Sequence, residues 1–285
     1  MSIEAEIARR LDGVQARITG AAARAGRDPD DVCLVAISKT QPDQRIAAAL
    51  TAGHRVFGEN RVQEAWAHWA NRRTVIDDLE LHLVGPLQTN KVRDAVALFD
   101  VIQTLDRPRL AVKLAKEFDR AGRQLRCFIQ VNTGEEPQKA GVLPVGADDL
   151  IAECRRLELP VEGLMCIPPA DEPAPPHFAL LGEIASRNGL AGLSMGMSAD
   201  FESAAELGAS HVRVGTGPLP QACDEALVDV VTEDRVAGGV GGTRDGEANR
   251  AEADHADLRL TRSDAVAQRL ERRAECAELL SHEVQ

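Results

Sequence analysis

The chain has 285 residues and a formal net charge of −12, which argues against a nucleic-acid or anionic-membrane partner, because those surfaces bind clustered cations. Its six cysteines are scattered, without a CxxC pair or a Cys/His cluster, and this predicts a reducing compartment and no metal site. No 18-residue apolar stretch occurs and the N-terminus is charged and amphipathic, so we expect a cytoplasmic protein.

Apolar residues at helical spacing over residues 3–26 predict an amphipathic first helix. Short apolar runs then alternate with helical patterns. We predict eight strands, at residues 32–38, 55–58, 80–84, 100–104, 125–131, 160–166, 190–194 and 211–215. Helices are expected between them, at 42–52, 61–72, 89–98, 107–121, 147–157, 176–188 and 199–207. This count predicts an α/β fold of the (β/α)8 TIM barrel type. A doubly wound sheet is the competing fold, but it usually has fewer strands.

The composition changes near residue 217. Residues 217–285 hold 15 acidic and 8 arginine side chains, no lysine and no aromatic residue. We therefore predict a barrel domain over residues 1–216 and an acidic, low-aromatic C-terminal extension over 217–285 that is partly disordered. The sequence of this end fits either a genuine extension or a frame-shifted translation.

Lys39 ends the first predicted strand, in the run Cys33-Leu-Val-Ala-Ile-Ser-Lys39. It is the first of five lysines in a chain that carries 28 arginines. An arginine would supply the same charge, but only an amine can form a Schiff base. Two interpretations stay open at this point: a solvated lysine that caps a strand, and a covalent anchor at the carboxyl end of the barrel, where active sites of this fold collect.

A candidate phosphate site follows the last two predicted strands. Met197 and Ser198 lie in a small-residue turn that runs into a helix, and Gly215 and Thr216 end the eighth strand. Such segments offer backbone N–H groups and hydroxyls to an anion. Arg213 lies two residues before Gly215, so both face the same side. A lysine anchor, a phosphate cradle and an inward arginine together predict pyridoxal 5′-phosphate. An arginine at the ring nitrogen leaves a weak electron sink, which favours holding the cofactor over carbanion chemistry.

Polar residues near other strand ends are less specific. Asn60 follows the second strand and can cap the next helix. His82 lies within the third strand, and we favour an interior histidine over a catalytic one. Lys139 lies in a long polar loop after the fifth strand, and we expect it to be solvated.

These segments, in this order, resemble the YggS/PROSC family of pyridoxal phosphate homeostasis proteins, whose fold is that of the alanine racemase N-terminal barrel, or PLP fold type III. The matching motifs cover about three quarters of the chain and are Ala36–Lys39, Phe57–Asn60, His82–Lys91, Gln130–Thr133 with Lys139–Gly141, Gly163–Pro168, Leu193–Ser198 with Asp200, and Val212–Thr216.

The resemblance implies a role for each cofactor-binding residue. Lys39 would carry the Schiff base, Arg213 would face the pyridine nitrogen and Asn60 would line the ring. The phosphate would be held by Ser198, Gly215, Thr216 and the backbone of Met197. Family members have no established turnover, are largely monomeric, and are thought to buffer the cofactor or deliver it to apo PLP-dependent enzymes.

Two alternatives remain. An amino-acid racemase of the same barrel needs a second base opposite the lysine, typically a tyrosine, and this chain has none, although Cys166 or His82 could substitute. A barrel that binds another phosphorylated metabolite would leave Lys39 as a rim lysine.

Overall fold

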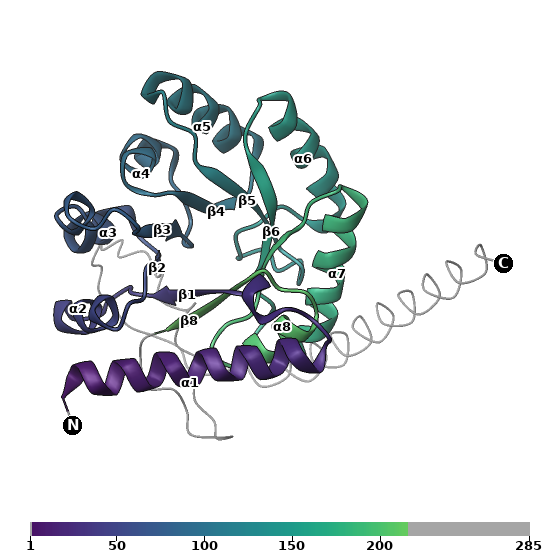
Figure 1. Cartoon of the computed structure of the whole chain (residues 1–285). Helices are drawn as coiled ribbons and strands as arrows, with labels where there is room; N and C mark the ends of the chain where they lie inside the picture. The colour runs from purple at the N-terminus through teal and green to yellow at the C-terminus, as the bar shows by residue number, and fades with distance from the viewer. Residues whose placement is uncertain (1, 216–285) are drawn as a thin grey trace, which may run out of the picture. The chain divides into compact units, whose positions relative to one another are not determined.

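The computed structural model describes residues 2–215, and these form a closed barrel of eight parallel strands paired in chain order, with helices around it (Figure 1). The strands are β1 (Cys33–Ile37), β2 (Val56–Glu59), β3 (Glu80–Leu83), β4 (Val101–Leu105), β5 (Arg126–Val131), β6 (Val161–Cys166), β7 (Gly192–Ser194) and β8 (His211–Gly215). The predicted TIM barrel is confirmed, and each predicted strand appears within about two residues of its expected bounds.

The helices lie outside the strands. They are α1 (Ile3–Arg24), α2 (Asp43–Thr51), α3 (Val62–Trp69), α4 (Val92–Leu98), α5 (Pro108–Ala121), α6 (Ala147–Arg156), α7 (Ala174–Arg187) and α8 (Phe201–Glu206). Short 3-10 helices occupy Pro29–Asp31, Arg72–Thr74, Thr89–Lys91 and Pro144–Gly146. The amphipathic first helix, α1, runs alongside α2 and α8 and covers that side of the barrel (Figure 1).

Successive side chains along each strand point alternately into the core between strands and helices and into the lumen of the barrel. On β8, Val212 and Val214 pack in the core between strands and helices, while Arg213 points into the barrel. A small apolar cluster of Val101 and Phe128 with Met165 also fills the barrel. The lumen is therefore partly polar, and hydrogen bonds join His82 of β3, Gln103 of β4, Ser194 of β7 and Arg213 of β8 inside it.

Among residues 2–215 no helix combines the length and the apolar character that are needed to cross a membrane. Thr216 and the predicted extension over 217–285 lie outside the described residues, so the boundary near residue 217 stays a prediction.

Candidate functional site

Lys39 lies at the rim formed by the carboxyl ends of the strands. Ile37 of β1 pairs with Gly58 of β2 on one side and with Gly215 of β8 on the other. Two residues further along β1 comes Lys39, and two residues beyond Gly58 comes Asn60. The barrel therefore brings the lysine, the asparagine and the glycine of the predicted phosphate site to the same sector of the rim.

The amine of Lys39 is only partly exposed. Burial lowers the pKa of Lys39, and the nearby Arg61 lowers it further, whereas Glu64 on α3 opposes the shift. A lowered pKa increases the share of neutral amine near neutral pH, and the neutral amine is the nucleophilic form.

The turn after Lys39 is strained, and a residue of α3 holds it by a hydrogen bond. Thr40 has a φ of 56°, a value that a β-branched residue rarely adopts. Its backbone N–H donates to the carboxylate of Glu64. Because this bond fixes the residue next to Lys39, Glu64 both orients the lysine turn and supplies the negative charge that acts on the Lys39 amine.

A buried carboxylate on β2 also supports this turn, through a hydrogen bond to the residue before Lys39. Glu59 of β2 is fully buried, and its Oε1 accepts hydrogen bonds from the Ser38 hydroxyl at 2.7 Å, from Trp69 Nε1 at 2.9 Å and from His68 Nδ1 at 2.9 Å. Ser38 precedes Lys39 directly, so residues on both sides of the lysine are bonded to glutamates.

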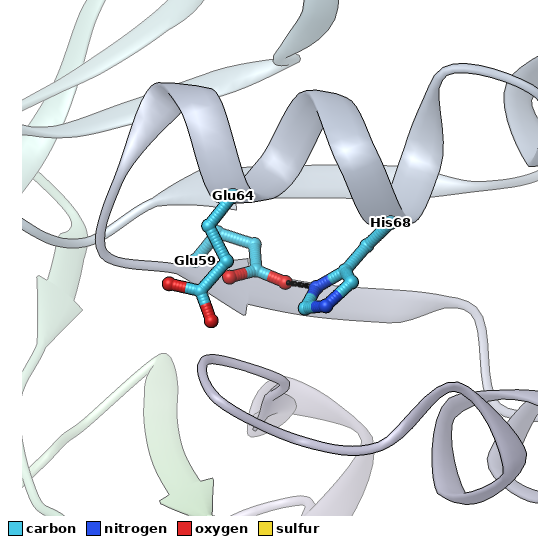
Figure 2. A group of neighbouring side chains, drawn as sticks. All are labelled: Glu59, Glu64 and His68. Atoms are coloured by element: carbon cyan, nitrogen blue, oxygen red, sulfur yellow. Dashed lines mark hydrogen bonds and ion pairs between the residues drawn. The ribbon is translucent and has the colours of Figure 1, made fainter.

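Figure 2 shows the Glu59 carboxylate between Glu64 and His68, with its bond to the histidine dashed. Their ligand-type atoms lie within 4.8 Å of one another, as in a metal site. However, His68 Nδ1 already bonds Glu59, and Glu64 already accepts from Thr40. Glu59 Oε2 is buried and has no hydrogen-bond partner among the described residues. We interpret the cluster as the support of the lysine turn. Sequence reasoning missed both glutamates, although a glutamate at the end of an apolar strand was a usable signal.

Capping of the next helix, one of the two roles considered for Asn60, is not what the structure shows. The residue at the N-cap of α3 is Arg61, and no side chain caps that end. Asn60 instead lies against the loop after β3, where a Cβ on Gly85 would come within 2.2 Å of the Asn60 carbonyl oxygen. Only glycine permits this close approach.

The two predicted phosphate segments meet in space. The backbone N–H of Gly215 donates to the Ser198 hydroxyl at 3.3 Å. The N–H of Met197 donates to the Asp200 carboxylate at 2.6 Å, and burial raises the pKa of Asp200. Gly196 makes this turn possible, because its φ is 89° and a Cβ there would meet the Ala204 side chain at 2.4 Å.

Arg213 lies deeper, inside the barrel, and is buried. Its guanidinium donates to the Ser194 hydroxyl at 2.7 Å and to the Cys166 carbonyl at 2.8 Å. Burial lowers the pKa of Arg213, but an arginine stays protonated in proteins. Within residues 2–215 no carboxylate lies at ion-pair distance from it.

Two expectations about other groups can be compared with the structure. Lys139 forms an ion pair with Glu136 at 2.7 Å and its side chain is only 18% exposed. The expectation that Lys139 is a solvated loop lysine is therefore wrong. His82 is an interior histidine, as expected, and it is fully buried. Burial raises the pKa of the Cys166 thiol to about 12, which makes this thiol a poor substitute for the absent tyrosine.

Comparison with known proteins places the fold in a family. Residues 10–218 match the family model described as the alanine racemase N-terminal domain. Proteins named pyridoxal phosphate homeostasis protein align with the same region. The relative from Escherichia coli K12 is 37% identical over 225 residues, 74% of this chain and 94% of its own length. The relative from Pseudomonas aeruginosa is 40% identical over 218 residues, 74% of this chain and 93% of its own length.

Solved structures agree. PipY from Synechococcus elongatus, determined with PLP bound, is 38% identical with a TM-score of 0.62, over 74% of this chain and 98% of that one. An unknown protein from Bifidobacterium adolescentis is 29% identical with a TM-score of 0.71, over 75% and 94%. An alanine racemase from Clostridium difficile, 15% identical with a TM-score of 0.55, shares the fold. The resemblance noted in the sequence is thus confirmed, and the chain belongs to the family of pyridoxal phosphate homeostasis proteins.

Proposed function

We propose that this protein binds pyridoxal 5′-phosphate and holds it for vitamin B6 homeostasis. The observation that supports this best is the strand register at the rim: the partly buried amine of Lys39 lies two residues beyond Ile37, whose partner on β8 is Gly215. Its family relatives carry the homeostasis name, and one of them, PipY, has been solved with PLP bound.

The residues present fit this cofactor. When bound, PLP supplies an aldehyde that reacts with an amine and a ring that withdraws electrons. Lys39 would provide the amine, and its lowered pKa favours the reactive neutral form. Asn60, on the neighbouring strand end, would line the ring.

The phosphate would be held by the segments after β7 and β8. Ser198, Gly215, Thr216 and the backbone of Met197 would supply hydroxyls and N–H groups. In the structure the Met197 N–H donates to the Asp200 carboxylate. A phosphate would therefore have to displace that carboxylate or share the N–H with it. Burial raises the pKa of Asp200, so this carboxylate takes up a proton more readily than an exposed one would.

Arg213 would face the ring nitrogen with its remaining N–H donors. A permanently charged arginine cannot deliver a proton to the ring, so the ring stays a weak electron sink. The chain has no tyrosine to serve as a racemase base, and the Cys166 thiol has a pKa of about 12. These features favour a carrier over a racemase. We further propose that the protein acts as a cytoplasmic monomer that buffers PLP or passes it to apo enzymes.

The test is uptake of PLP by the purified protein. We expect a visible absorbance band that Lys39→Ala abolishes and that the exposed α5 substitution Lys116→Ala leaves intact. Borohydride reduction followed by peptide mapping should locate the label on Lys39. A wild-type protein that takes up no PLP at saturation would overturn the proposal. Solvent deuterium at the α-carbon of alanine would favour the racemase instead.

A further inference from the structure

A continuous polar chain runs through the barrel away from Arg213. Its three middle residues are fully buried and come from β7, β4 and β3: Ser194, Gln103 and His82. The links are Arg213–Ser194 at 2.7 Å, Ser194–Gln103 at 2.6 Å, Gln103–His82 at 2.7 Å and His82–Glu80 at 2.6 Å. Glu80 begins β3, so the chain ends at the opposite, amino-terminal end of the barrel.

Chemistry decides the direction of every bond. Arg213 can only donate, so the Ser194 oxygen accepts and its single proton goes to Gln103 Oε1. The amide nitrogen of Gln103 then donates to His82 Nδ1, which leaves the proton of this neutral ring on Nε2. That N–H donates to the Glu80 carboxylate. All four bonds therefore point the same way, from the cation to the anion.

This alignment links a buried cation to a carboxylate at the other end of the chain, and Glu80 also forms an ion pair with Arg126 at 2.7 Å. Arg213 is buried without a carboxylate at ion-pair distance among the described residues, which is costly unless its donors are satisfied. The His82 hydrogen bond, together with Arg126, lowers the pKa of Glu80 to about 2, so this end is anionic. Bonds in a chain polarise one another, and here each bond dipole presents its negative end to the arginine.

Burial is the main factor that favours the neutral form of the His82 ring. Burial lowers the pKa of His82, and Arg126 acts in the same direction, whereas Glu80 and Asp100 oppose it. The ring of His211 on β8 lies 5.7 Å away. Protonation of His82 would place a second donor against the Gln103 amide and break the chain at its centre.

We propose that Ser194, Gln103 and His82 are positioning residues that hold the Arg213 guanidinium in the place where it would face the ring nitrogen of the cofactor, with Glu80 as the anchor of the chain. The inference rests on the proposed binding of PLP. It makes a binding site at one end of the barrel depend on hydrogen bonds that reach the other end. Breaking any link frees the guanidinium to adopt other rotamers and weakens the hold on the cofactor.

The first test compares two serine deletions. Ser194→Ala removes a link of the chain, while Ser210→Ala removes a hydroxyl that bonds Leu193 of β7 and the ring of His211, neither of which is a link of the chain. We expect Ser194→Ala to raise the dissociation constant for PLP at least about tenfold, as for the loss of a hydrogen bond to a charged group, and Ser210→Ala to leave it unchanged. Gln103→Leu should repeat the effect of Ser194→Ala from another strand.

The second test uses pH and the wild-type ring itself. PLP affinity of the wild type and of Ser210→Ala should decline on the acid side more steeply than protonation of Lys39 alone explains. His82→Gln, which cannot take up the proton at this position, should lose that additional decline and keep the part that comes from Lys39. In the wild-type apoprotein, ¹⁵N chemical shifts of His82 should show the proton on Nε2. This readout needs no variant that has to fold.

The outcomes separate the two proposals. If the wild type binds PLP but Ser194→Ala matches Ser210→Ala in affinity, or if His82 carries its proton on Nδ1, the positioning chain is wrong. If the wild type binds no PLP while His82 shows the expected tautomer, the chain stands as a structural feature and the proposed function fails.

Discussion

Thr40 donates its backbone N–H to the Glu64 carboxylate, and this bond holds a β-branched residue at a φ of 56° directly after Lys39. Strained conformations of this kind persist only when neighbouring groups hold them in place, and they concentrate at functional sites. Here the group that restrains the turn is also the carboxylate that opposes the lowering of the pKa of Lys39.

Glu64→Gln separates these two effects. The glutamine oxygen can still accept from Thr40, so the turn should survive. The lost negative charge removes the group that raises the pKa of Lys39, so the pKa should fall further and covalent uptake of PLP should begin at lower pH. The measurement is the pH dependence of the absorbance change on adding PLP. The exposed α7 substitution Glu183→Gln is the control, and an unchanged profile for Glu64→Gln would contradict this role.

Glu59→Ala should destabilise the barrel. The change strips the acceptor from three donors, on the buried Ser38 and Trp69 and on the partly buried His68. We expect the free energy of unfolding to fall by at least about 3 kcal/mol, measured by denaturant titration. The exposed Glu162→Ala on β6 should stay within about 0.5 kcal/mol of the wild type. A Glu59 variant as stable as that control would show that the network contributes nothing to folding.

Gly196→Ala should damage the phosphate cradle. Its φ of 89° and the 2.4 Å approach to the Ala204 Cβ leave no room for a side chain. We expect lower thermal stability and weaker binding of PLP, and of inorganic phosphate as a probe. The matched change Gly182→Ala lies in helix α7, where a Cβ meets nothing within 4 Å, and should stabilise by about 0.5–1 kcal/mol. Equal behaviour of the two variants would be evidence against the cradle.

As the pH falls, the protein should lose stability in the range where unfolded histidines titrate, before it reaches the range where carboxylates do. Burial lowers the pKa values of His54, His82 and His211, the last to about 3. Unfolded histidines titrate near about pH 6.5, so the unfolded chain takes up protons first as the pH falls. Stability is therefore complete above that pH and declines below it, by up to about 1.4 kcal/mol per histidine per pH unit.

Denaturant midpoints between pH 8 and pH 5 measure this decline. His82→Gln should flatten part of it. The lowered pKa of Glu80, about 2, adds its own loss of stability only at much lower pH, because its unfolded value is near about 4.3. Midpoints that stay constant down to pH 5 would mean that these histidines are not held neutral.

The arrangement of strands and helices was readable from the amino-acid sequence. Apolar alternation and helical spacing are local patterns, so the eight strands appear close to their predicted bounds. Parallel strands bring their carboxyl ends to one rim, and this is why Lys39, Ser198 and Gly215 could be expected near one another from the order of the segments alone.

Contacts between side chains of different strands were decided by the tertiary structure alone. Gln103 meets both Ser194 and His82 only because the closed barrel brings β7, β4 and β3 around one lumen. The stagger of the strands sets such meetings, and no local pattern encodes it. By itself the sequence determined which groups stand at the strand ends, and the packing decided which of them touch.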